Sequence, residues 1–319
     1  MLKDNVLIFM GICCLCVKIK PLHAKTWPLQ DSIVSKASDV QKLDGGPAAQ
    51  ETIQVPQLGD PGVVQNISNQ TVMQKTTNDS LKSSDASIHL FTIPLSLSPD
   101  SVDDMYYGCS HNMLIKVKRD YLPKSTNDHL YTASTTLCAH KAMKNKDIAD
   151  LLSLDHFRAL CAYTAGAYAD LNRAVRKGKT FYRNSFEFHA LHFLLSDAIR
   201  LLKLNQGTCF TTYRRSRRLF SSQVGQTIRF GSFASSSLSN NLTQFGRRTC
   251  FDIRTCYGAY LKSYSEFDSD EDEVLIPPYE MFNIVSVDMS GDSHLHCDVV
   301  YKLETAGIYS SLNCQAVDL

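Results

Sequence analysis

Residues 250–254 read Cys250-Phe251-Asp252-Ile253-Arg254, so that apolar Phe251 and Ile253 alternate with charged Asp252 and Arg254. Successive side chains of a β-strand point to opposite faces, and this alternation therefore predicts a strand with one buried face. Similar segments lie on both sides of it. The segments rich in β-branched and aromatic residues, with turn residues between them, are 208–213, 226–235, 249–255, 273–277, 281–288 and 295–313.

The chain that precedes these strands has helical periodicity. Apolar residues recur at spacings of three and four after Asp155, which can cap a helix, and the pattern stops at Gly178. A second helix is predicted to begin at Asn184, with Glu187 completing a capping box. Helices followed by strands favour an α+β fold, with a helical N-terminal lobe and then a mainly antiparallel, two-sheet β-sandwich.

The composition is that of an ordinary globular chain, but its charges are segregated. Of 319 residues, 44% are hydrophobic, and 33 Lys and Arg balance 32 Asp and Glu to a net charge of +1. This balance supplies no overall field for a polyanion and argues against nucleic acid as a partner. Four arginines nevertheless fall within residues 214–218, and five acids within residues 268–273. Arginine's planar fork suits phosphate and carboxylate oxygens.

The N-terminal hundred residues differ from the rest. Residues 1–24 combine a basic Lys3, an apolar run at 6–17 and the small residue Ala24, which predicts a secretory signal peptide. Residues 25–100 hold six of the ten prolines and only two aromatics. Such a stretch buries too little apolar surface to offset its ordering entropy, so a disordered, glycosylated leader is expected. The compact domain is expected to span residues 101–319.

Cysteines and sequons agree with export. Eight cysteines remain after residue 24, and an even number in a secreted chain suggests disulfides. N-linked glycosylation is predicted at the four N-x-S/T sequons, which lie at Asn66, Asn69, Asn78 and Asn241. The sequence shows no apolar C-terminal tail of the kind that a GPI signal needs, and no second long apolar run. The product is therefore expected to be secreted and extracellular, with no transmembrane anchor.

No metal site is expected. The chain has no CxxC pair of the kind that binds zinc. The acidic run at 268–273 has the Asp-x-Asp-x-Asp spacing of a calcium loop, but Glu273 and Tyr279 stand where that loop needs its glycine and its last glutamate.

Three segments together are similar to a known family. Arg214 follows a predicted strand, and the other two segments read Arg229-Phe230-Gly231-Ser232-Phe233-Ala234-Ser235-Ser236-Ser237-Leu238 and Glu271-Asp272-Glu273-Val274-Leu275-Ile276-Pro277-Pro278-Tyr279-Glu280. They closely resemble the vertebrate arginine-specific ecto-mono-ADP-ribosyltransferases. The family's Arg, Ser and Glu-x-Glu constellation is matched by Arg214, Ser235, Glu271 and Glu273. The resemblance covers the compact part of the chain and none of the leader. It implies that the compact part has the family's fold.

The resemblance implies a monomeric transferase that moves ADP-ribose from NAD+, its co-substrate, to arginine side chains of extracellular or secretory-pathway proteins and releases nicotinamide. Breaking the bond between nicotinamide and ribose builds positive charge on the ribose, which a carboxylate stabilises in the transition state. The resemblance gives that role to Glu273. Glu271 would orient the acceptor guanidinium and assist loss of its proton.

The remaining roles follow from the same resemblance. Arg214 would hold the phosphate beside the nicotinamide ribose, and Ser235 would hold Glu273 or the ribose in place. Phe245 is expected to stack on nicotinamide. Tyr264 or Phe267 would offer an aromatic face to the acceptor arginine.

One departure keeps two alternatives open. Family members commonly have glycine after the first-motif arginine, whereas this chain has Arg215, whose Cβ could crowd a ligand. Arg215 and the long leader are the motives for one alternative, a non-catalytic secreted binding glycoprotein that keeps the fold. The other alternative is NAD+ glycohydrolase activity, in which water replaces arginine as the acceptor. The family's disulfides imply Cys109 with Cys314 and Cys209 with Cys256. The pairing of Cys138, Cys161, Cys250 and Cys297 stays open.

Overall fold

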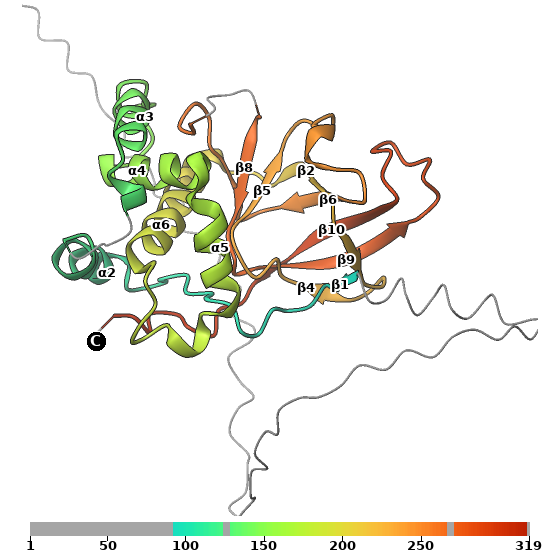
Figure 1. Ribbon diagram of the computed structural model, residues 1–319, viewed down its shortest axis with the longest axis horizontal. Coiled ribbons are helices and arrows are strands. Elements are labelled where there is room, and N and C mark those ends of the chain that lie inside the picture. The colour runs from blue at the N-terminus through green and yellow to red at the C-terminus, as the bar shows by residue number, and fades with distance from the viewer. Residues whose placement is uncertain (1–91, 124–127, 267–270, 318–319) are drawn as a thin grey trace, which may run out of the picture. The chain divides into compact units, whose positions relative to one another are not determined.

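In the computed structural model, residues 92–123, 128–266 and 271–317 are described, and they form helices followed by strands (Figure 1). The predicted α+β class is confirmed. The α-helices are α2 (Ser110–Lys116), α3 (Ala133–Lys144), α4 (Leu154–Ala162), α5 (Tyr168–Lys177) and α6 (His189–Gln206). Shorter π-helical and 3-10 turns lie at Val117–Tyr121, Asp128–Leu130, Tyr163–Ala167, Lys179–Phe181 and Thr243–Phe245. None of the helices in the described ranges combines the length and the apolar character that crossing a bilayer requires.

The strands form one large sheet and one small one. The large sheet has eight strands, in the spatial order β4 (Thr227–Ile228), β9 (Glu280–Asp288), β10 (Val299–Ile308), β6 (Thr249–Thr255), β2 (Phe210–Ser216), β5 (Ala234–Ser237), β8 (Glu273–Ile276) and β7 (Ala259–Tyr260). Its neighbouring strands are antiparallel except for β10 and β6. In the small sheet, β1 (Thr92–Pro94) pairs in parallel with β3 (Leu219–Ser221). The predicted mainly antiparallel, two-sheet arrangement is thus found, with sheets of very unequal size.

Two apolar cores position the site. Phe251 and Ile253 of β6 are buried in a core shared with β9 and β10, as the alternation predicted, whereas Cys250 belongs to a small cluster on the opposite face. The helices gather on one side of the sheet, beside β5 and β8 (Figure 1). Their core includes Phe233 and Leu275 from the sheet. The strands that meet the helical lobe are therefore β5, β7 and β8.

The helix boundaries differ from expectation in two places. The first helix is capped by Ser153, whose hydroxyl and backbone N–H both contact Nδ1 of the buried His156, rather than by Asp155. It ends near Gly178 as predicted, but a π-helical turn with a positive φ at Gly166 divides it into α4 and α5. The second helix begins at His189, not at Asn184.

The capping box predicted at Asn184 is therefore wrong. Residues 184–188 form turns that bury Phe186 and Phe188 in the helical core while Glu187 stays exposed. Burial of the two aromatic rings outweighs the local capping pattern, because burying each ring stabilises the fold by more free energy than a helix cap does.

The predicted strand 226–235 and the domain boundary also differ. The strand is interrupted between β4 and β5, where Gly231 has φ of +66° and approaches Ser98 so closely that a Cβ would lie 2.5 Å from its Oγ. Ser98, which meets this turn, lies in the segment that was expected to be leader. The strand β1 at Thr92–Pro94 comes from the same segment and pairs with β3 in the small sheet. We therefore propose that the compact domain begins before Ser101 and includes β1.

Four disulfides close the domain. Cys109 is bonded to Cys314 and Cys209 to Cys256, as the resemblance implied. The four cysteines whose pairing was open form Cys138–Cys161 and Cys250–Cys297. The first pair joins α3 to α4, and the second lies in the small cluster behind β6.

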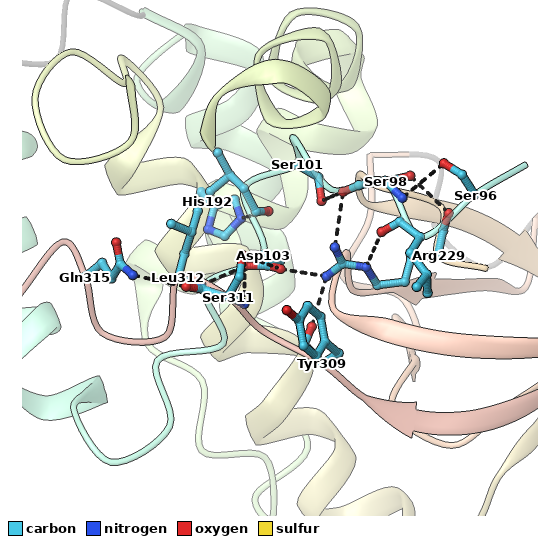
Figure 2. A network of polar contacts seen from close by, with 12 residues as sticks. Ser96, Ser98, Ser101, Asp103, His192, Arg229, Tyr309, Ser311, Leu312 and Gln315 are labelled. Carbon is cyan, nitrogen blue, oxygen red and sulfur yellow. Dashed lines mark hydrogen bonds and ion pairs between the residues drawn. The ribbon is translucent and has the colours of Figure 1, made fainter. Parts of the chain in front are cut away.

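A buried ion pair connects the segment after β1, the chain between β4 and β5, and the chain after β10 (Figure 2). Arg229 is 2% exposed, and its Nη1 lies 2.7 Å from Oδ2 of the fully buried Asp103. The same guanidinium donates to the backbone carbonyls of Leu97, Ser98 and Tyr309. The carboxylate of Asp103 also accepts from the backbone N–H groups of Ser311 and Leu312. Arg229, although part of the motif at 229–238, thus supports the fold.

Candidate active site

Three neighbouring strands bring together the residues of the Arg, Ser, Glu constellation. Arg214 lies on β2, Ser235 on β5 and Glu273 on β8, and these strands are adjacent in the sheet. Nη1 of Arg214 donates to the carbonyl of Ser235 over 2.5 Å. Ser237 on β5 lies directly opposite Glu273 on β8. Side chains 59 positions apart in the sequence, counted from Arg214 to Glu273, therefore share one small region of the sheet.

The carboxyl group of Glu273 lies in an environment that favours its neutral form. Glu273 is 8% exposed, and burial raises its pKa to about 7, with a smaller contribution from the negative charge of Glu271. A hydrogen bond with Ser235 and the positive charge of Arg214 act in the opposite direction. A carboxyl group with a pKa so perturbed, placed beside an arginine at the end of strands, is typical of a functional site.

The turn before β8 is held in a defined shape. The hydroxyl of Ser237 donates to the carbonyl of Glu271 over 2.6 Å, and Leu238 N–H donates to the carbonyl of Asp272 over 3.1 Å. Asp272 has a positive φ of +43°, and its carboxylate accepts from the Tyr260 hydroxyl. Glu271 is consequently fixed at its backbone while its side chain stays partly exposed.

The helical lobe contributes a tyrosine and an asparagine. The hydroxyl of Tyr163, in the π-helical turn, donates to the carbonyl of Phe233 and lies 3.5 Å from the hydroxyl oxygen of Ser235. Nδ2 of Asn172, on α5, donates to the same carbonyl and to Tyr163. Asn172 is 8% exposed, and its Oδ1 is buried without a hydrogen-bond partner among the described residues. An unpaired buried acceptor is costly and is common where a ligand supplies the donor.

Arginines from two elements surround this region. Burial is the main cause of the lowered pKa of Arg176, on α5, and the positive charges of Arg218 and Arg214 lower it further. Burial also lowers the pKa of Arg214, whereas the negative charge of Glu273 acts to raise it. Positive charges that lower the pKa of Arg176 repel its guanidinium, and an anionic ligand would relieve that repulsion.

Arg215 does not crowd this region. It pairs with Cys250 across the β2–β6 ladder, so its side chain leaves the opposite face of β2 from that of Arg214. Its Nη1 lies 3.3 Å from Sγ of Cys297, and its Nη2 donates to the carbonyl of Asn240 over 2.6 Å. The expected crowding by a Cβ at this position is therefore not found.

Comparison with known proteins gives the family. The model of the family "NAD:arginine ADP-ribosyltransferase" matches residues 95–299. The chain belongs to the NAD:arginine ADP-ribosyltransferase family. Among relatives, NAD(P)(+)-arginine ADP-ribosyltransferase 2 of Gallus gallus is 33% identical over 234 residues, which are 70% of this chain and 73% of the relative. Ecto-ADP-ribosyltransferase 4 of Homo sapiens is 34% identical over 238 residues, 70% of this chain and 73% of that one.

Solved structures of the NAD:arginine ADP-ribosyltransferase family agree with this fold. The crystal structure of the eukaryotic mono-ADP-ribosyltransferase ART2.2 is 31% identical, with a TM-score of 0.56, and the match covers 70% of this chain and 98% of that one. A variant of ART2.2 in complex with NADH matches with a TM-score of 0.59 at 29% identity, over the same shares of the two chains. The resemblance stated from the motifs is thereby confirmed.

The other predicted site residues of this family member have different environments. Phe245 lies in a 3-10 turn and is 45% exposed, which leaves its ring free to stack on a ligand. Asn241 is exposed in the same loop, as a glycosylation site requires. Phe267, Asn66, Asn69 and Asn78 lie outside the described residues.

Tyr264 cannot recognise an acceptor in the way that was expected. It is 1% exposed, its ring meets Phe157 edge to face, and its hydroxyl donates to the buried carboxylate of Asp150 over 2.8 Å. The backbone N–H of Asp147 donates back to that hydroxyl. A ring held on every side offers no face to an incoming guanidinium, so the prediction for Tyr264 is corrected to a structural role.

Asn172 and Arg176 were missed by the sequence reasoning. Both lie on the helix from Tyr168 to Lys177, whose apolar stripe was taken as core. The available signal was a polar Asn at a position four residues from Tyr168 and one after the buried Leu171, which the apolar spacing does not explain. Among the residues within the described ranges, no group of three His, Cys, Asp or Glu side chains could hold a metal ion.

Proposed function

We propose that this chain transfers ADP-ribose from NAD+ to arginine side chains of extracellular or secretory-pathway proteins, with release of nicotinamide. The observation that carries the proposal is the convergence of Arg214, Ser235 and Glu273 on adjacent strands, with Glu271 in the turn before β8. Membership of the NAD:arginine ADP-ribosyltransferase family supports both the donor and the acceptor.

In the proposed reaction, the bond between nicotinamide nitrogen and ribose C1′ breaks, and its electron pair leaves with nicotinamide. Positive charge then develops on the ribose, and the ionised carboxylate of Glu273 stabilises it in a largely water-excluded position. A guanidinium nitrogen of the acceptor forms the new bond to C1′. Glu271, whose side chain is partly exposed, orients that guanidinium and takes up the proton that it loses.

The arginines and Asn172 are suited to the rest of NAD+. Arg214, Arg176 and Arg218 present guanidinium groups to a pyrophosphate, which would relieve the repulsion among them. The unpartnered Oδ1 of Asn172 would accept a hydrogen bond from a hydroxyl of the dinucleotide. Ser235 would hold Glu273 through the hydrogen bond that already lowers its pKa.

Radiolabelled NAD+ with an arginine analogue as acceptor tests the proposal. Label should pass from the adenylate-labelled donor to the analogue, and Glu273→Gln should lower this rate by about 100-fold or more, as loss of one group that stabilises transition-state charge does. Glu271→Gln should abolish transfer to the analogue but keep measurable NAD+ hydrolysis. Glu187→Gln, an exposed glutamate on the helical lobe, is the matched control and should leave the rate unchanged.

Two outcomes would reject the proposal or part of it. Wild-type protein that neither transfers label nor consumes NAD+ is the outcome expected of the alternative, a binding glycoprotein. Equal loss of transfer and hydrolysis in a folded Glu271→Gln variant would argue against separate roles for the two glutamates. One of the two motives for the binding glycoprotein is Arg215, and its side chain leaves the face of β2 opposite to that of Arg214.

Export is the second part of the proposal. The four disulfides among the described residues fit an oxidising compartment. We propose residues 1–24 as a signal peptide, a monomeric product outside the cell, and N-linked glycans at the four sequons. Mass spectrometry of protein secreted from animal cells, before and after glycosidase treatment, should show a new N-terminus near residue 25 and a loss of mass at Asn241. Retention of residues 1–24 or of the protein within the cell would contradict it.

A further inference from the structure

The loop that carries Phe245 is held by few contacts of its own. Leu238–Gly246 follows β5, ends two residues before β6 begins at Thr249, and contains the 3-10 turn Thr243–Phe245. Short-range hydrogen bonds shape it internally, from Thr243 N–H to the Asn241 carbonyl and from Gly246 N–H to the Thr243 carbonyl. Most of its side chains are exposed, so little apolar burial fixes its position.

Two arginines of the basic cluster attach this loop to the sheet. Nη2 of Arg215 donates to the carbonyl of Asn240 over 2.6 Å, and Nη2 of Arg217 donates to the carbonyl of Gln244 over 2.9 Å. Arg215 is the last residue but one of β2, and Arg217 directly follows the end of that strand, so both lie close to the loop. Gln244 directly precedes Phe245, so the second bond holds the ring's own backbone.

The guanidinium of Arg215 is itself fixed. Its Nη1 lies 3.3 Å from Sγ of Cys297 and 3.6 Å from Sγ of Cys250, the two sulfurs of one disulfide. Both cysteines are almost fully buried. Arg215 therefore joins a rigid part of the sheet to a loop that is otherwise attached by Arg217 and by Leu238 N–H, which donates to the carbonyl of Asp272.

We propose that Arg215 and Arg217 are positioning residues that hold the loop Leu238–Gly246, and with it the ring of Phe245, in place for NAD+ through hydrogen bonds to two loop carbonyls. This inference rests on the proposed function. It divides the basic cluster by role, since Arg214 and Arg218 face the dinucleotide while Arg215 and Arg217 hold the loop. Hydrogen bonds from a charged donor are about twice as strong as neutral ones, which suits them to a loop with little apolar burial.

Two measurements on Arg215→Gln, Arg217→Gln and the double variant test it. Hydrogen–deuterium exchange of the peptides covering residues 238–248 should be faster than in the wild type, with exchange of β6 beyond them unchanged. In NAD+ turnover, KM for NAD+ should rise about tenfold in each single variant, the size of one hydrogen bond to a charged group, with kcat changed much less. Arg215→Lys keeps one donor and should recover part of the affinity.

A matched control separates loop position from loss of charge. Arg248→Gln removes the same positive charge two residues beyond the loop, where Arg248 forms an exposed ion pair with Asp298. It should change neither the exchange of the loop nor KM for NAD+. An equal rise in KM in Arg248→Gln would assign the effect to the positive field and overturn the proposal.

The outcomes keep this inference apart from the proposed function. If hydrogen–deuterium exchange of the loop is unchanged in the double variant, Arg215 and Arg217 do not hold the loop, and the proposal is overturned whatever the activity. Faster exchange with unaltered KM for NAD+ also overturns it, because the loop would then not position anything for the dinucleotide. Absence of NAD+ turnover in the wild type rejects the proposed function instead, and exchange alone then decides whether the two arginines hold the loop.

Discussion

The carboxyl group of Glu273 should control activity near neutral pH. Its pKa is raised to about 7, mainly by burial, so the carboxylate to which we assign stabilisation of the ribose cation exists above that pH and is lost as the pH falls through it. We expect the kcat/KM of NAD+ hydrolysis to rise with pH to a plateau, with an apparent pKa near 7. Initial rates between about pH 5.5 and 8.5 measure it.

Two variants should move this pH profile in opposite directions. The charge of Glu271 raises the pKa of Glu273, so Glu271→Gln should shift the rise of NAD+ hydrolysis to lower pH. A hydrogen bond with Ser235 lowers that pKa, so Ser235→Ala should shift it to higher pH. Shifts in the same direction in both variants, or a profile without a limb near neutrality, would show that another group titrates.

Arg176 is expected to bind the dinucleotide although it lies far from the motif in sequence. Arg176→Gln removes a guanidinium whose pKa is lowered by the charges of Arg218 and Arg214, and KM for NAD+ should rise about tenfold, as for loss of a charged hydrogen bond. Arg173→Gln lies on the same helix, where Arg173 forms an exposed ion pair with Asp170, and should leave KM unchanged. Equal KM values for the two variants would place the phosphates elsewhere.

For single residues, the sequence predicted which side chains lie together in the candidate site better than it predicted which side chains are buried around that site. Arg214, Ser235 and Glu273 lie together because their motifs are carried by adjacent strands, which pattern and family resemblance both indicate. Tyr264 failed because an aromatic residue in a loop can be buried, and its partner Asp150 is 114 positions away. Contacts over such separations leave no local pattern in the sequence.

Among the elements, the loop Leu238–Gly246 depends on a glycine. Gly246 has φ of +130°, and a Cβ there would lie 2.4 Å from the carbonyl carbon of Ser216 on β2. Gly246→Ala should therefore both strain the backbone and push the loop away from β2. Gly225→Ala is the matched control, because Gly225 also has a positive φ, +85°, but open space around its Cβ.

The two glycine variants should differ in stability and in substrate binding. Backbone strain alone costs about 1–2 kcal/mol, which corresponds to a fall in Tm of roughly 2–8 °C for a domain of this size. Gly246→Ala should exceed Gly225→Ala in this loss and should alone raise KM for NAD+. Equal falls in Tm with unchanged KM would show that the loop tolerates displacement from β2.

Element boundaries were predicted well only where one signal dominated. β6 was placed at 249–255 because alternation and burial agree there. The interruption between β4 and β5 could not be predicted from the sequence. It depends on the close approach of Ser98 to Gly231, and Ser98 lies in a segment whose composition predicts a disordered leader. The start of α6 was displaced because Phe186 and Phe188 enter the core at the site of a plausible cap.

For the whole molecule, the ion pair of Arg229 with Asp103 joins the segment after β1, the turn before β5 and the chain after β10 (Figure 2). Its loss should destabilise the domain as a unit. In Arg229→Met the carboxylate of Asp103 stays buried without its cation, which costs about 3–5 kcal/mol. At about 2–4 °C per kcal/mol, Tm should fall by roughly 6–20 °C.

Thermal denaturation of three variants, followed by circular dichroism, tests whether the buried pair of Arg229 with Asp103 stabilises the domain more than an exposed ion pair does. Arg248→Gln breaks an exposed pair and should lower Tm by no more than about 4 °C, because such pairs contribute about 0–1 kcal/mol. Combining Arg229→Met with Asp103→Leu removes the unpaired buried charge and should recover part of the loss. The carboxylate also accepts from the backbone N–H groups of Ser311 and Leu312, so recovery should be incomplete. If Arg229→Met melts within about 2 °C of the wild type, the ends of the domain are held by the Cys109–Cys314 disulfide and its neighbours instead of by this pair.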